Sequence, residues 1–138
     1  MLNRSQLQKL ALIRLKEAKV LLDNDLYSGA YYLSGYVIEC ALKACIAKRT
    51  REFDFPDKKT VLDSYSHDLE KLVKTARIEV LLKEHLENEP EFEKNWSCVK
   101  DWSEESRYKE YNPEKANDIY LAVNDTNYGV LQWVQQYW

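Results

Sequence analysis

The sequence predicts an all-α protein, an up-and-down bundle of about five helices. Glycine and proline occur three times each, too rarely for the many tight turns of an all-β fold. Apolar residues recur at helical spacing, and one central stretch, residues 29–44, is apolar on nearly every side. Such a helix is expected at the centre of a bundle. A chain of 138 residues fits one domain, so we assign residues 1–138 to a single domain.

The first two helices are expected to pack as an antiparallel pair. Ser5 and Gln8 have the spacing of a capping box, which predicts that the first helix begins at Ser5. The run Asp23-Asn24-Asp25 ends this helix, and the second follows over residues 26–49. The connection is short, and short connections join antiparallel neighbours.

The middle of the chain predicts a loop and then short helices. Residues 50–66 are expected to form the loop, with Phe53, Phe55 and Pro56 partly against the bundle. A short helix follows His67, because acidic residues in its first turn suit the helix dipole.

Residues 78–87 continue as helix, and Pro90 fits the first turn of the next one. Residues 103–111 are expected to be a loop or a frayed turn. The last helix begins with Asn112 as its cap and Pro113 at its first position, and its apolar face continues to Val134.

Charge, cysteines and apolar runs exclude several classes of protein. The net charge of −3 argues against nucleic-acid binding by the whole surface. Cys40, Cys45 and Cys98 lack metal-ligand spacing, which favours buried thiols in a reducing cytoplasm. No signal peptide or bilayer-spanning run is recognisable, so no membrane association is expected. We also expect no metal and no cofactor, because histidines at ligand spacing and a glycine-rich phosphate loop are missing.

A thin stripe interrupts the apolar surface of the second helix. Gly35, Glu39 and Lys43 follow one another at intervals of four residues. Gly35 is expected to allow a close approach by another helix. Glu39 and Lys43 have the spacing of a helical salt bridge. Alternatively, Glu39 lies in a groove and positions a basic partner.

Two further segments combine chemically useful side chains. The segment 107–112 is basic and aromatic and leads into a helix N-terminus, so Arg107 could bind an anion and Tyr108 and Tyr111 could stack on bases. The structural alternative is a solvated connection in which Asn112 only caps a helix. His67 near a helix start is expected to be a local cap or a packing contact.

Residues 34–44 resemble a known family pattern. They read Ser34-Gly35-Tyr36-Val37-Ile38-Glu39-Cys40-Ala41-Leu42-Lys43-Ala44 and look like the pattern A-G-Y-x-x-E-x-x-L-K of prokaryotic HEPN domains. The segment His67-Asp68-Leu69-x-x-Leu72 and the C-terminal helix fit the same pattern in order and spacing. The resemblance covers about residues 5–137 and implies an α-helical bundle that is usually a homodimer.

The resemblance also implies a function. Many HEPN proteins are toxins or defence proteins that act as metal-independent endoribonucleases, often paired with a nucleotidyltransferase-type antitoxin. Their site is an Arg-x4–6-His motif near the start of the last conserved helix, and a polar residue of the second helix orients the arginine. Arg107 matches this arginine and Glu39 the orienting residue. Asn112 stands at the first histidine position and no histidine follows His85, so the proton-transferring side chain of the motif is missing.

We therefore expect a non-catalytic HEPN-like binding or assembly module, in a toxin–antitoxin or phage-defence setting. It would dimerise and bind RNA, a nucleotide or a partner protein around Arg107, Glu39, Lys43, Tyr108, Tyr111 and Asn112. One alternative is a divergent endoribonuclease whose candidate catalytic residues are Arg107, Glu39 and either His67 or Tyr111. The other is a purely structural dimerisation module, in which the four tryptophans and the aromatic C-terminus, with Trp133 and Trp138, form the dimer face.

Overall fold

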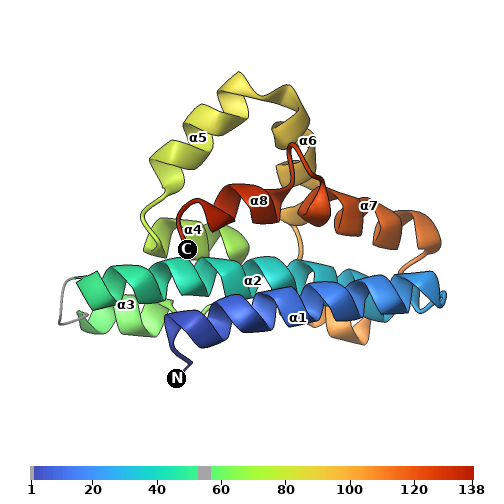
Figure 1. The fold of residues 1–138 in the computed structure, drawn as a ribbon, viewed down its shortest axis with the longest axis horizontal. Coiled ribbons are helices and arrows are strands. Elements are labelled where there is room, and N and C mark those ends of the chain that lie inside the picture. Colours follow the sequence, from blue (N-terminus) through green and yellow to red (C-terminus); the bar gives the residue numbers. More distant parts are fainter. Residues whose placement is uncertain (1, 53–56) are drawn as a thin grey trace.

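The computed structural model describes residues 2–52 and 57–138, which contain helices and connections and no strand. The all-α class predicted from the sequence is confirmed. Two long helices, α1 (Arg4–Asp23) and α2 (Tyr27–Glu52), lie side by side along the length of the molecule (Figure 1). The predicted antiparallel pairing of the first two helices is confirmed.

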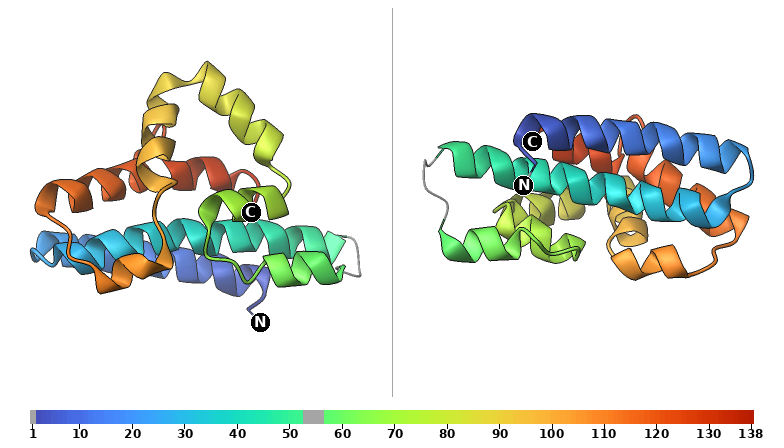
Figure 2. Two further views of the ribbon diagram at one scale, coloured as in Figure 1. Left: turned by 180° about the vertical axis from the view of Figure 1, so that it is seen from behind. Right: turned by 90° about the horizontal axis from the view of Figure 1, so that it is seen from below.

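The shorter helices cover α2 on its other sides. They are α3 (Lys58–Asp63), α4 (Leu69–Thr75), α5 (Glu79–Asn88), α6 (Pro90–Val99), the 3-10 helix η1 (Glu104–Tyr108), α7 (Pro113–Asn124) and α8 (Val130–Gln135). Helices α7 and α8 run along α2, whereas α5 and α6 rise away from it as an arch (Figure 1). Seen from below, α3 and η1 lie on the same flank of α2, towards its opposite ends (Figure 2).

The core forms where these helices meet α2. Its largest fully buried side chains come from α2, α4, α6, α7 and α8 and include Ile38, Leu42, Leu69, Leu72, Phe92, Ile119, Val123, Val130 and Val134. Burying each such side chain stabilises the fold by about 1.5–3 kcal/mol. The all-round apolar character of α2 therefore reflects its central position. Within the described part of the chain, no helix is both long enough and apolar enough to cross a bilayer.

The first helix begins at Arg4 instead of Ser5, and its N-cap lies two residues earlier than predicted. Asn3, not Ser5, is the N-cap: its side chain accepts a hydrogen bond from the Gln6 N–H, and the Gln6 side chain accepts one from the Asn3 N–H. The predicted kind of cap is present at the predicted spacing, but Asn3 and Gln6 form it instead of Ser5 and Gln8. The earlier start also allows Arg4 to donate a hydrogen bond to the Trp138 carbonyl, which ties the two ends of the chain together.

The predicted loop over residues 50–66 was wrong in part. Helix α2 continues through Glu52, and α3 forms inside the predicted loop with Asp57 as its N-cap. The Asp57 side chain accepts a hydrogen bond from the Thr60 N–H, at 2.7 Å. Phe53, Phe55 and Pro56 lie outside the described residues.

The predicted last helix is two helices. The Asp125 side chain accepts a hydrogen bond from the Tyr128 N–H, and the Asn95 side chain donates one to the Tyr128 carbonyl, so the chain turns between α7 and α8. Gly129 sits where a Cβ would lie 2.4 Å from the Asp125 carbonyl oxygen. The turn therefore depends on close contacts between backbone atoms. The apolar periodicity of the sequence does not indicate these contacts.

The tryptophans belong mainly to the core. Trp96, Trp102 and Trp133 are buried, and Trp133 packs against His85, Phe92 and Tyr137. The placement of these three side chains on a dimer face is therefore wrong, because they are already covered by their own chain, whereas Trp138 is partly exposed and dimerisation stays a prediction.

Gly35 provides the close approach that its position predicted, but to a tryptophan and not to another helix. A Cβ at Gly35 would lie 2.2 Å from the Trp102 ring atoms Cδ1 and Cγ. The same indole stacks on Tyr32, with the ring centroids 5.8 Å apart. Gly35 thus sets the position of the chain just before η1.

We predict that Gly35→Ala lowers the free energy of unfolding by about 1–3 kcal/mol, because the added methyl group overpacks the Trp102 seat. Urea denaturation followed by circular dichroism measures this. Gly29→Ala is the matched control, since its Cβ would meet only the flexible Leu21 side chain, at 3.1 Å. Equal effects of the two substitutions would contradict the assigned role of Gly35.

Candidate functional site

The candidate site is organised around Glu39, a carboxylate buried in the middle of α2. Only 2% of Glu39 is exposed, and a buried carboxylate needs positive or hydrogen-bonding partners. Lys43 Nζ lies 3.4 Å from Oε2, and His67 Nδ1 lies within hydrogen-bond distance of Oε1, at 2.9 Å. Both oxygens of Glu39 are therefore engaged, and the expected salt bridge with Lys43 is present.

His67 reaches Glu39 from the connection between α3 and α4. Asp68 caps α4 by accepting a hydrogen bond from the Lys71 N–H, and the Asp68 N–H donates to Ser66 Oγ. These local bonds hold the backbone on both sides of the histidine. The other ring nitrogen of His67, Nε2, lies 3.1 Å from Glu104 Oε2. A carboxylate therefore faces each nitrogen of the imidazole.

The 3-10 helix η1 brings Arg107 into this neighbourhood. The Arg107 side chain is exposed, and its guanidinium carbon lies 4.9 Å from the centroid of the Tyr108 ring. Tyr108, with smaller contributions from Tyr32 and Glu104, raises the pKa of Arg107, so the guanidinium stays charged. Glu104 thus contacts His67 and contributes to the electrostatic environment of Arg107. Glu39, which was expected to orient Arg107, holds Lys43 and His67.

The other residues predicted for the site have structural contacts. The Tyr111 ring stacks on Tyr31 with centroids 3.7 Å apart, and the Tyr111 N–H donates to Ser28 Oγ. Burial, with Tyr111 beside it, raises the pKa of Tyr31 to about 12. The Asn112 side chain accepts a hydrogen bond from the Lys115 N–H and caps α7. Tyr108 remains the exposed aromatic side chain of the segment, with 78% of its surface accessible.

Sequence reasoning missed two residues that shape the site. Glu104 bridges η1 to His67, and Trp102 fixes the entry into η1. Gly35 was a signal for a close approach to α2, although it did not identify Trp102 as the neighbour. No feature of the sequence pointed to Glu104, since it is one of many acidic residues.

A hollow of about 620 Å³ lies beside His67 and is strongly acidic. The carboxylates along it are Asp68, Glu70, Asp101, Glu104 and Glu105. The basic side chains are Lys100 and His67. This excess of negative charge disfavours a phosphodiester backbone at the hollow.

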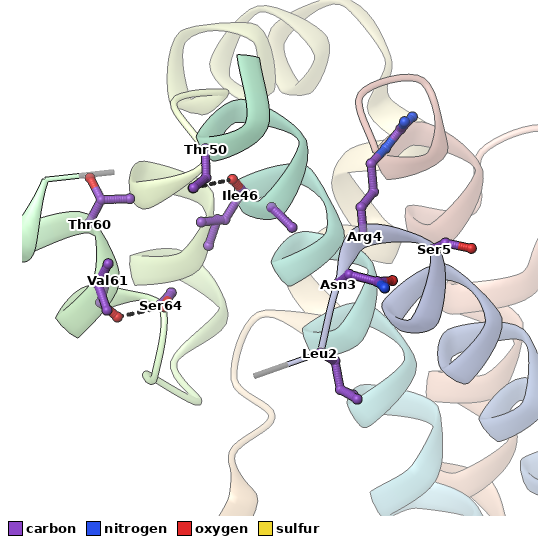
Figure 3. A pocket seen from close by; sticks show the side chains of 10 residues that line it. Leu2, Asn3, Arg4, Ser5, Ile46, Thr50, Thr60, Val61 and Ser64 are labelled. Atoms are coloured by element: carbon purple, nitrogen blue, oxygen red, sulfur yellow. Dashed lines mark hydrogen bonds between the residues drawn. The ribbon is translucent and has the colours of Figure 1, made fainter. Parts of the chain in front are cut away.

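A second hollow, of about 450 Å³, lies away from all of these residues. It is bounded by the start of α1, the end of α2 and α3, with Ile46 and Val61 among its apolar side chains (Figure 3). The Arg4 guanidinium points away from it (Figure 3). Across the described residues, no group of three or more His, Cys, Asp or Glu side chains is arranged to hold a metal ion.

The chain is an all-α bundle whose central helix α2 carries Gly35, Glu39 and Lys43, and Arg107 precedes α7. These features together define the class of protein to which the chain belongs. The HEPN domain family matches residues 5–137, nearly the whole chain. The chain belongs to this family. Comparison with curated proteins and with solved structures gives no match.

We predict that Glu39→Gln lowers the free energy of unfolding by about 1–3 kcal/mol, because Lys43 and His67 lose the carboxylate that balances them. Urea denaturation near neutral pH measures the change. Asp23→Asn is the control, because it breaks an exposed ion pair with Lys19 that is worth about 0.5 kcal/mol or less. A Glu39→Gln effect no larger than this control would show that the buried carboxylate does not organise the site.

Proposed function

We propose that this chain is a non-catalytic HEPN-type binding module whose recognition surface is the exposed pair Arg107 and Tyr108 on η1. The environment of His67 supports this proposal. Carboxylates face both of its ring nitrogens, at 2.9 and 3.1 Å, so each nitrogen already has a partner within the chain. Asn112, at the histidine position of the family motif, serves as a helix cap.

A protein partner suits this surface better than RNA does. Arg107 and Tyr108 offer a fixed cation and an aromatic face, and Arg and Tyr are the residue types that often dominate protein interfaces. Five carboxylates line the neighbouring hollow, which would repel a nucleic-acid backbone. The family resemblance makes a nucleotidyltransferase-type antitoxin or a second copy of the chain the partners to test first, in a toxin–antitoxin or phage-defence setting.

A divergent metal-independent endoribonuclease is the second candidate. One observation favours it: Glu104, which lies 3.1 Å from His67 Nε2, also contributes to the electrostatic environment of Arg107. If a bound RNA displaced Glu104, Nε2 of His67 would become available, with Arg107 on the same 3-10 helix as the displaced carboxylate. Catalysis in this form requires that the acidic hollow accept a phosphodiester.

We predict that the purified protein does not cleave single-stranded RNA in the absence of added metal, and that Arg107→Ala behaves identically. The reason is the lack of a free imidazole beside Arg107. Gel analysis of end-labelled RNA measures this. Cleavage by the wild type that is lost in Arg107→Ala would replace the binding module by the ribonuclease.

The binding surface formed by Arg107 and Tyr108 is tested against one partner protein. This partner is the protein encoded by the gene adjacent to the gene of this chain. We expect Arg107→Ala to weaken its binding about tenfold or more, the effect of losing a central arginine from an interface. Lys109→Ala is the matched control, because it removes an exposed cation from the same segment. Similar losses in both variants would indicate non-specific charge attraction, and no loss in either would refute the assigned surface.

A further inference from the structure

His67 contacts two parts of the chain, the middle of α2 and the 3-10 helix η1. One ring nitrogen lies 2.9 Å from Glu39 on α2, and the other lies 3.1 Å from Glu104 on η1. Glu39 is fixed in the core, whereas Glu104 belongs to a short surface helix. The imidazole therefore acts as a bridge between the centre of the bundle and the segment that carries Arg107.

The bridge depends on the charge of the imidazole. An imidazolium has an N–H on both nitrogens and attracts both carboxylates. A neutral imidazole has one N–H. If that N–H stays on Glu39, the lone pair of Nε2 faces the Glu104 carboxylate and the contact becomes repulsive. Loss of one proton from His67 therefore weakens the link to η1 and leaves the link to α2 in place.

Several charged groups surround His67. They are Glu39 and Lys43 on α2, Asp68 and Glu70 at the start of α4, Lys100 and Asp101 after α6, and Glu104 and Glu105 on η1. Acidic groups predominate among them.

Besides His67, η1 is held by its packing against α2 and by the interaction of Arg107 with Tyr32. Its entry is fixed by Trp102 against Gly35, and the chain beyond it is fixed by Tyr111 on Tyr31. Between these points, Ser106 is buried, but its hydroxyl has no hydrogen-bond partner in the described chain, and neither does the Trp102 indole N–H. Opening of η1 would let both groups bond to water, which lowers the free-energy cost of opening.

We propose that the protonation of His67 controls how firmly η1 is closed against α2, and with it the presentation of Arg107. Closure is firm when the imidazole is protonated and looser when it is neutral. The consequence for recognition rests on the proposed function of Arg107, whereas the opening of η1 does not.

Hydrogen exchange of the backbone amides of residues 103–109 tests the switch without any ligand. Exchange is measured by mass spectrometry at about pH 5.5 and about pH 8, on either side of the usual histidine range. Protection factors correct for the intrinsic effect of pH on exchange. We expect protection of this segment to fall about threefold more at the higher pH than protection of α2, the size expected for losing a partly exposed ion pair.

Glu104→Gln removes the charged end of the bridge and should abolish this pH-dependent difference. Glu105→Gln is the matched control, because it removes the neighbouring charge from the same hollow and should leave the difference unchanged. His67→Gln provides a second test if Glu104→Gln does not fold. Protection of η1 that does not depend on pH in the wild type, or that changes equally in Glu104→Gln, would overturn the switch. Loss of partner binding in Arg107→Ala is a separate result, so the switch and the binding surface can fail independently.

Discussion

A carboxylate buried in the middle of the central helix is the constraint on which this site depends. Glu39 lies among apolar neighbours, where an unpaired charge would be strongly destabilising. Lys43 supplies one partner from the next turn of α2, and His67 supplies the other from the connection before α4. The requirement to balance one buried charge therefore positions the histidine, and the histidine in turn contacts η1 through Glu104.

A second constraint acts at Gly35, about one turn before Glu39 on the same face of α2. Gly35 leaves room for the Trp102 indole to lie against the α2 backbone, four residues before the buried carboxylate. Trp102 starts the segment that contains Glu104 and Arg107, so glycine and glutamate on one stripe of α2 together determine the path of η1. Gly35 and Glu39 therefore determine where the exposed Arg107 side chain lies on the surface.

The chemistry of the site follows from which groups remain free. Tyr111 and Asn112 are used in stacking and capping, and His67 has a carboxylate at each nitrogen. Arg107 and Tyr108 remain exposed. This distribution supports recognition over proton transfer, and the acidic hollow beside it supports a protein surface over a phosphate backbone as the ligand.

The sequence by itself determined the helical class, the central position of α2 and the Asn112 cap of α7, because apolar periodicity and capping residues are local signals. It also indicated a close approach at Gly35 and the salt bridge between Glu39 and Lys43, since both lie within one helix. Only the tertiary structure decided the break between α7 and α8 and the position of His67 between Glu39 and Glu104. These features join residues far apart in the chain, and their contacts depend on how the helices pack, which no local pattern encodes.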